Sequence, residues 1–123
     1  MFGEDTKQTD VFSKVQDLVD NALNGVNCSV IFYGQTGSGK THTMTGGPRK
    51  QDGVLQQTIH HIYSKADEYE ELNSSCTMVQ VYKSDLADLL RNRDTLPTAL
   101  EIWLDSNGSA FVDATQVEHS FKE

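Results

Sequence analysis

A glycine-rich loop limits more strongly than any other feature what this chain can fold into. It matches the pattern G-x-x-x-x-G-K-[S/T] at every fixed position and reads Gly34, Gln35, Thr36, Gly37, Ser38, Gly39, Lys40 and Thr41. A continuous apolar run over residues 29–33 precedes the loop, and no helix breaker follows it until Gly46. A strand, a glycine-rich turn and a helix in this order form a phosphate-binding loop, so we expect a layered α/β fold of the P-loop NTPase type.

The chemistry of a phosphate chain explains why these residue types occur together. Its negative charges must be met by many donors at short range, and glycines let backbone N–H groups converge without an intervening Cβ. The helix that follows adds partial positive charge at its N-terminus. Lys40 is the predicted catalytic residue, because its ammonium group would follow the β- and γ-phosphates, and the Thr41 hydroxyl is the predicted Mg²⁺ ligand. A chance match is the alternative, and the apolar run before the loop argues against it.

Hydrophobic periodicity predicts the helices around the loop. Apolar residues three and four positions apart predict one helix over residues 10–24, which Gly25 ends, and another from residue 54 to about residue 71. A short helix should begin at Lys40, directly after the loop. We therefore expect helices both before and after the phosphate-binding loop.

Apolar runs and turn signals predict the strands. Residues 29–33 are apolar without alternation, as in a central strand covered on both faces, and residues 76–82 form a second strand. A helical turn is expected over residues 86–90. Residues 100–104 and 110–112 should pair as a hairpin, because Asn107-Gly108 lies in the turn between them. The predicted fold is thus one of central strands flanked by helices, plus a β-hairpin.

Charge and cysteine content exclude several classes of function. The 123 residues carry a formal net charge of −8, which argues against nucleic acid and anionic membranes as partners, since these need a basic face. No apolar run approaches the length needed to cross a membrane. Cys28 and Cys76 lie beside or within apolar runs, so buried, reduced thiols are expected and the chain is predicted to be cytosolic.

Two further candidate sites have simpler explanations. His60 and His61 are adjacent on a predicted helix and cannot face one metal together, so an exposed pair beside a helix face is expected. Asp105 follows an apolar run and imitates a magnesium-binding aspartate, but the turn signal directly after it favours a hairpin corner. Neither feature predicts a metal site.

The residues around the loop resemble a known family. Residues 32–46 are similar to the phosphate-loop signature of kinesin motor domains, in which the middle loop positions and the trailing His42-Thr43-Met44 are fixed as well. The resemblance implies that His42 lies near the adenine of a bound nucleotide. Agreement in order and spacing extends to residues 10–27, 53–55, 79–82 and 88–90.

The resemblance implies a particular activity. Kinesins bind ATP with Mg²⁺, hydrolyse it and move along microtubules, so the expected setting is the cytoplasm and its cytoskeleton. The two γ-phosphate sensors of the family, Asn-x-x-Ser-Ser-Arg-Ser-His and Asp-x-Ala-Gly-Ser-Glu, do not occur in this sequence, and neither does the opening strand. Residues 1–123 are therefore expected to be about the middle third of a motor domain and to lack full activity alone.

Departures from the family pattern bear on filament binding. Residues 80–84 read Gln-Val-Tyr-Lys-Ser where kinesins usually carry Glu-Ile-Tyr-Asn-Glu, and Asp113 and Glu118 stand where basic residues commonly touch tubulin. The stretch 82–90 and the hairpin over 100–117 resemble the minus-end-directed, C-terminal-motor group. The sequence assigns no oligomeric state.

Two other functions stay open on the sequence. One is a non-motor remnant that keeps a kinesin-like nucleotide-binding fold and acts as an interaction module. The other is an unrelated P-loop kinase or GTPase, although the base-reading motif Asn-Lys-x-Asp of a GTPase is not found. The flanking sequence of the gene would separate a motor from a remnant, because a motor gene encodes both γ-phosphate sensors.

Overall fold

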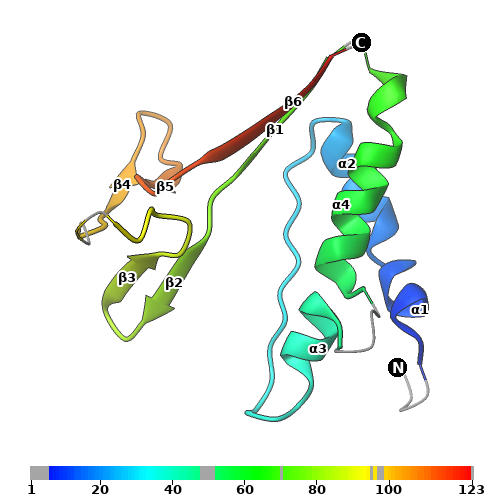
Figure 1. The fold of residues 1–123 in the computed structure, drawn as a ribbon, viewed down its shortest axis with the longest axis horizontal. Coiled ribbons are helices and arrows are strands. Elements are labelled where there is room, and N and C mark those ends of the chain that lie inside the picture. Colours follow the sequence, from blue (N-terminus) through cyan, green and yellow to red (C-terminus); the bar gives the residue numbers. More distant parts are fainter. Residues whose placement is uncertain (1–5, 48–51, 70, 95, 97–98, 123) are drawn as a thin grey trace. The chain divides into compact units, whose positions relative to one another are not determined.

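The computed structural model describes residues 6–47, 52–69, 71–94, 96 and 99–122. They belong to two compact units, unit 1 over Met1–Tyr69 and unit 2 over Glu70–Glu123 (Figure 1). Unit 1 carries the phosphate-binding loop and all the helices of the described residues, and unit 2 carries their strands.

Helix α4 is the centre of unit 1, because it contacts each of the other α-helices of that unit. The described helices are α1 Gln8–Phe12, α2 Gln16–Leu23, α3 Lys40–Thr45, α4 Val54–Ser64 and the 3-10 turn η1 Ala66–Glu68. The expected helix start at Lys40 is confirmed. Gly25 ends α2 as predicted: it adopts φ 87°, a value that favours glycine, and its N–H donates to the carbonyl of Ala22 at 3.0 Å.

Two helix predictions were too long. The helix expected over residues 10–24 is interrupted by a turn at residues 13–15, where the Ser13 hydroxyl bonds the carbonyl of Asp10 at 2.8 Å. A short polar side chain that bonds the preceding turn competes with the helical ladder. The helix expected to reach residue 71 ends at Ser64, and Glu71 opens a strand instead.

The strand expected over residues 29–33 does not form in the described part of the chain. The segment has no strand partner there, and its side chains are exposed by 44% at Val30, 79% at Ile31 and 89% at Tyr33. An apolar run becomes a central strand only when other strands supply its backbone hydrogen bonds. The strands of the described residues pair among themselves, so this run stays unpaired.

The expectation of buried thiols was also wrong. Cys28 and Cys76 are both free and exposed. Cys28 lines an open apolar hollow of about 180 Å³ together with Val30 and residues of α2 and α4. The thiol is accessible because Cys28 directly precedes the unpaired run and has no covering strand in the described residues.

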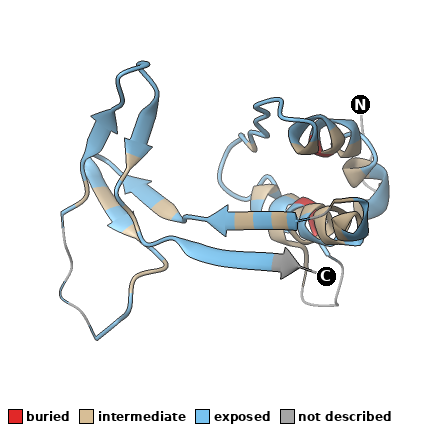
Figure 2. Ribbon diagram, turned by 90° about the horizontal axis from the view of Figure 1, so that it is seen from above, coloured by how far each residue is buried: buried red, intermediate tan, exposed pale blue. Residues whose placement is uncertain are grey.

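The hydrophobic core of the described residues is very small. Among apolar side chains only Val19 of α2 and Val54 of α4 are buried, at 7% and 3% exposure. Figure 2 shows buried positions on the helices of unit 1 and a sheet region in unit 2 that is mostly exposed. Complete burial of apolar side chains among the described residues is therefore limited to one residue in each of α2 and α4.

Unit 2 consists of three two-stranded antiparallel sheets among its described residues. The pairs are β1 Glu71–Cys76 with β6 Val117–Lys122, β2 Val79–Tyr82 with β3 Asp85–Asp88, and β4 Ile102–Leu104 with β5 Ala110–Val112. The predicted strand over residues 76–82 is split between β1 and β2. The helical turn expected over residues 86–90 was wrong, because Lys83 adopts φ 55° in a two-residue turn that folds residues 85–88 back onto β2.

The predicted hairpin of residues 100–104 and 110–112 is confirmed as β4 and β5. The N–H of Gly108 donates to the Asp105 carbonyl at 3.0 Å, and the N–H of Asp105 donates to the Ser109 carbonyl at 2.9 Å. Gly108 has φ 80°, as the left-handed position of a three-residue hairpin loop requires. Asp105 Oδ1 accepts from the N–H groups of Asn107 and Ser109. Asp105 therefore stands at the corner of the hairpin, as predicted, and its carboxylate bonds the backbone of the turn.

Asp88 at the end of β3 ties two distant parts of unit 2 together. Its Oδ2 accepts from the hydroxyl of Thr115 at 2.5 Å and from the N–H of the same residue at 2.8 Å. Its Oδ1 accepts from the N–H groups of Leu90 and Arg91. These bonds, the Thr115 hydroxyl first, hold the pKa of the Asp88 carboxyl below its ordinary value, because they favour the charged form.

Candidate nucleotide-binding site

Three glycines give the loop over residues 34–41 its backbone shape. Gly34, Gly37 and Gly39 have φ values of 151°, 82° and 88°, a range that other residues rarely adopt. A tight turn over residues 35–38 contains Gly37, and there the N–H of Ser38 donates to the Gln35 carbonyl at 3.2 Å. Gly39 is the N-cap of α3, and its carbonyl accepts from the N–H of Thr43. The two fixed glycines of the sequence pattern, Gly34 and Gly39, thus both stand where the backbone has a positive φ.

A side chain at residue 34 would also meet Ser38. A Cβ added there would lie 2.6 Å from the hydroxyl oxygen of Ser38. A Cβ there would require the Ser38 hydroxyl to turn away, whereas the φ of 151° at Gly34 is a constraint that no neighbouring side chain can relieve.

Lys40 reaches back over the start of the loop. Its Nζ donates to the carbonyl oxygens of Gly34 and Gln35, at 2.8 Å each. The ammonium group therefore lies against the backbone of the loop, and it bridges the start of the loop to the start of α3. No acidic residue occurs between residues 34 and 47, so nothing in the loop itself neutralises this charge.

The loop and the first turn of α3 border an open hollow of about 270 Å³. The lining residues are Gly37, Ser38, Gly39, Lys40, Thr41 and His42. These residues fit a phosphate group, because left-handed glycines, a single cation and exposed hydroxyls surround the hollow without any carboxylate. Thr41 is exposed at the start of α3, and its carbonyl accepts from the Thr45 hydroxyl at 2.9 Å. The predicted site residues that line this hollow are therefore brought together, whereas Gln35 and Thr36 lie exposed at the tip of the turn.

The C-terminal end of α3 packs closely on the start of α4. A Cβ on Gly53, the residue before α4, would lie 2.4 Å from the backbone N of Gly46 and 2.5 Å from the carbonyl oxygen of Met44. The side chain of Gln56 in α4 donates to the Thr45 carbonyl at 2.9 Å. The helix of the phosphate loop thus rests on α4 through backbone-to-backbone contact.

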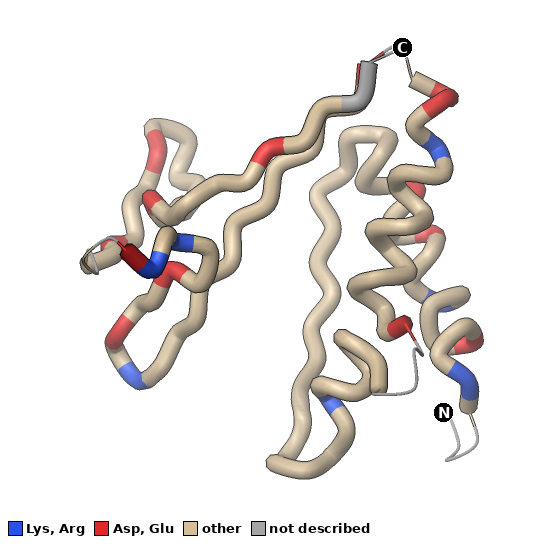
Figure 3. Tube along the Cα trace, in the orientation of Figure 1, with Lys and Arg blue, Asp and Glu red and all other residues tan. Residues whose placement is uncertain are grey.

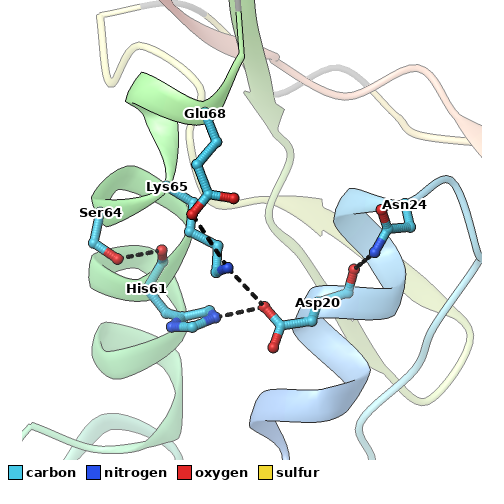
Figure 4. A network of polar contacts seen from close by, with 6 residues as sticks. All are labelled: Asp20, Asn24, His61, Ser64, Lys65 and Glu68. Carbon is cyan, nitrogen blue, oxygen red and sulfur yellow. Dashed lines mark hydrogen bonds and ion pairs between the residues drawn. The ribbon is translucent and has the colours of Figure 1, made fainter.

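A polar network joins α4 to α2 (Figure 4). His61 Nε2 lies 2.7 Å from Asp20 Oδ1, and Lys65 is 3.9 Å from the same oxygen and 3.4 Å from Glu68. The His61 contact lowers the pKa of the Asp20 carboxyl. The expected exposed histidine pair was therefore half wrong, since the His60 side chain is 75% exposed and the His61 side chain only 14%. Asp20 lies 41 residues from His61, a separation that no local sequence signal spans.

No metal site appears among the side chains of the described residues. No group of three or more His, Cys, Asp or Glu residues gathers there in a way that could hold an ion. Within the same residues, none of the helices is long and apolar enough to cross a membrane. Magnesium held through one hydroxyl and a phosphate needs no such group, because that ion usually keeps several waters.

The loop and its helix have the geometry of a P-loop, the phosphate-binding element of the P-loop NTPases. Comparison with known proteins gives the family. A family model described as the kinesin motor domain matches residues 1–122. Kinesin-like protein klpA of Emericella nidulans is 39% identical over 125 residues, which cover 96% of this chain and 16% of klpA. Kinesin-like protein Klp61F of Drosophila melanogaster is 34% identical over 129 residues, covering 94% of this chain and 12% of Klp61F.

A solved structure agrees with these relatives. The C-terminal motor domain of Kar3 from Candida glabrata is similar with a TM-score of 0.77 and 30% identity, over 95% of this chain and 38% of the Kar3 chain. The chain therefore belongs to the kinesin motor-domain family, with the P-loop NTPase type of α/β fold, as its sequence predicts. It spans about a sixth or less of the two kinesin-like relatives.

Proposed function

We propose that this chain is the ATP-binding part of a microtubule motor whose complete domain hydrolyses ATP and moves along microtubules. The position of Lys40 supports the ATP-binding part of the proposal, and the match to the kinesin motor-domain model supports the motor part. Its ammonium group bonds two carbonyls of the loop that it closes, so a positive charge is held beside the hollow before any phosphate arrives. A charge held in place in this way needs little reorganisation to stabilise a transferring phosphoryl group.

Each residue of the site has a role in this proposal. Backbone N–H groups of the loop and Lys40 would hold the phosphates, Thr41 would bind Mg²⁺ through its hydroxyl, and His42 would lie beside the nucleoside. ATP with Mg²⁺ supplies the phosphoanhydride bond whose cleavage drives the motor. Residues 1–123 then form a partial motor domain, and we expect the flanking sequence of the gene to encode the opening strand and both γ-phosphate sensors.

Charge limits which surfaces of this part can meet a filament. Acidic residues outnumber basic ones by 18 to 10 in the chain, and no continuous basic stretch occurs in the coloured part of the trace (Figure 3). Microtubule surfaces are acidic, so we expect the filament contact to come mainly from other parts of the parent domain, in the cytoplasm and on the cytoskeleton. Neither nucleic acid nor membrane is proposed as a partner. The similarity to the C-terminal motor domain of Kar3 favours the C-terminal-motor group.

Calorimetry with ADP and Mg²⁺ tests the site. Lys40→Ala should weaken binding about 10- to 100-fold, because a charge-assisted hydrogen bond contributes about 1.5–3 kcal/mol. Lys14→Ala is the matched control, since it removes an equal charge from an exposed turn away from the loop. Thr41→Ala should reduce the dependence on Mg²⁺. Equal affinities of the Lys40 and Lys14 variants would end the assignment, and binding without ATP hydrolysis by the parent protein would favour a non-motor remnant.

A further inference from the structure

We propose that Gln8 is a positioning residue of the nucleotide site, which holds the His42 ring with Nδ1 as a hydrogen-bond acceptor and with its proton on Nε2. The inference rests on the proposed nucleotide function and deepens it, because His42 lines the same hollow as the phosphate loop. Gln8 belongs to α1 and lies 34 residues before His42. It does not line that hollow.

One amide group of Gln8 meets two atoms of His42. Gln8 Nε2 lies 2.6 Å from the backbone carbonyl oxygen of His42 and 3.2 Å from Nδ1 of its ring. An amide nitrogen carries two hydrogens, so it can serve both atoms at once. The contact therefore fixes the backbone and the ring of the same residue from a separate helix.

The carbonyl decides which way the amide of Gln8 is turned. A carbonyl oxygen only accepts hydrogen bonds, and with the amide reversed, Gln8 Oε1 would face it at 2.6 Å without a proton between the two oxygens. The NH₂ group must therefore face His42, and it has no capacity to accept. Nδ1 of His42 must consequently be the acceptor, which leaves Nε2 as the protonated nitrogen of a neutral ring. A doubly protonated ring would place an N–H against the NH₂ group.

Two further observations show that this arrangement is specific. Gln8 Oε1 is buried and has no hydrogen-bond partner among the described residues, so the orientation serves His42 at the expense of the other end of the amide. On the opposite edge of the ring, a Cβ at residue 47 would lie 3.2 Å from both Cδ2 and Nε2 of His42. Gly47 therefore lets the ring lie close to the backbone. Between Gln8 and Gly47 the ring has one orientation and one tautomer.

This geometry predicts that the loss of Gln8 affects binding of the nucleoside but not binding of the phosphates. Gln8 bonds His42 but none of the residues 34–41, so Gln8→Ala should release the ring while the phosphate loop keeps its contacts. Affinity for ADP should fall about 2- to 10-fold, the loss expected for one hydrogen bond, and affinity for inorganic pyrophosphate should stay within about 2-fold. Gln8→Glu should place a carboxylate against the carbonyl and favour a proton on Nδ1.

Nitrogen-15 NMR of the histidine rings tests the proposal on the 123-residue chain. We expect His42 to show the Nε2–H tautomer in the unsubstituted chain, a mixture of the two tautomers in Gln8→Ala, and the Nδ1–H tautomer in Gln8→Glu. Gln57→Ala is the matched control, because it removes a glutamine that bonds the Asp52 carbonyl at 2.9 Å and not His42. Titrations with ADP and with pyrophosphate follow on the same samples.

Several results would overturn the proposal. One is an unsubstituted chain in which His42 carries its proton on Nδ1 or shows no single tautomer. Another is an unchanged His42 signal in both Gln8 variants. A third is an equal loss of affinity for ADP and for pyrophosphate in a Gln8 variant whose dispersed amide spectrum shows that it is folded. If Gln8→Ala does not fold, Gln8→Glu decides through the ring signal alone. If neither ADP nor pyrophosphate binds the unsubstituted chain, the proposed nucleotide function fails. The tautomer of His42 then still decides whether Gln8 positions its ring.

Discussion

The variant Gly53→Ala tests how closely α4 supports the helix of the phosphate loop. Gly53 has φ −75° and ψ −177°, which alanine adopts without strain, so its backbone conformation alone would make the substitution harmless. The new Cβ, however, would lie 2.4 Å from the N of Gly46, 2.5 Å from the O of Met44 and 2.6 Å from the C of Met44. All three atoms belong to the backbone, so no side chain can rotate away.

The magnitude follows from these two effects. Alanine stiffens the unfolded chain and would by itself stabilise the fold by about 0.4–1 kcal/mol. Forcing extra volume into a packed contact costs about 1–3 kcal/mol, and rigid backbone neighbours place this case at the upper end. We expect a net loss of about 2 kcal/mol in the free energy of unfolding, with α3 displaced from α4.

Urea unfolding followed by circular dichroism at the helix band measures this loss. Gly25→Ala separates strain from crowding, because Gly25 has φ 87° and nothing lies within 4 Å of its added Cβ. That variant should lose only about 1 kcal/mol, the cost of a left-handed conformation. The reasoning is refuted if Gly53→Ala is as stable as the unsubstituted chain, or loses less than Gly25→Ala.

Two other predictions concern unit 2 and the whole chain. Asp88 has a pKa below its ordinary value in the folded state, so its contribution to stability is fully present above the pKa of the unfolded chain and is lost as the pH falls through the folded value, below about pH 4. NMR of the Thr115 amide should follow this transition, and Thr115→Val should move it to higher pH; identical titrations would contradict the assigned cause. With two buried apolar side chains in the described residues, thermal unfolding should be broad and centred below ~45 °C, under the range of intact mesophile domains, and a sharp transition above that range would contradict it.

Local chemistry accounts for the parts of the fold that the sequence predicts. The loop, the start of α3, the end of α2 and the corner of the β4–β5 hairpin all depend on residues within a few positions of each other. At Gly25, Gly39 and Gly108 the deciding factor is a positive φ that glycine adopts at no steric cost. The same locality explains why Lys40 and Thr41 fall together beside the hollow.

Contacts between residues far apart in the sequence account for the predictions that were wrong. Whether residues 29–33 form a strand depends on a partner strand, and their composition cannot supply one. Residues 85–88 became a strand because the turn at Lys83 returns them to β2, although Leu86, Leu89 and Leu90 suggested a helical turn. Gln8 contacts His42, which lies 34 positions further along the chain, and His61 contacts Asp20, which lies 41 positions before it. Only the folded arrangement of α1 with α3 and of α2 with α4 brings those side chains together.

The unpaired run over residues 29–33 leads directly into Gly34 and the phosphate loop. If neighbouring strands of the parent domain pair with this run, they restrict the backbone at the entrance of the loop, and the loop then has fewer conformations to lose when a phosphate binds. Coupling free energies are reciprocal, so a bound nucleotide must strengthen the pairing of that strand by the same factor. Nucleotide and neighbouring strands would thus act as effectors of one another, and assembly of the central sheet would itself be ligand-dependent.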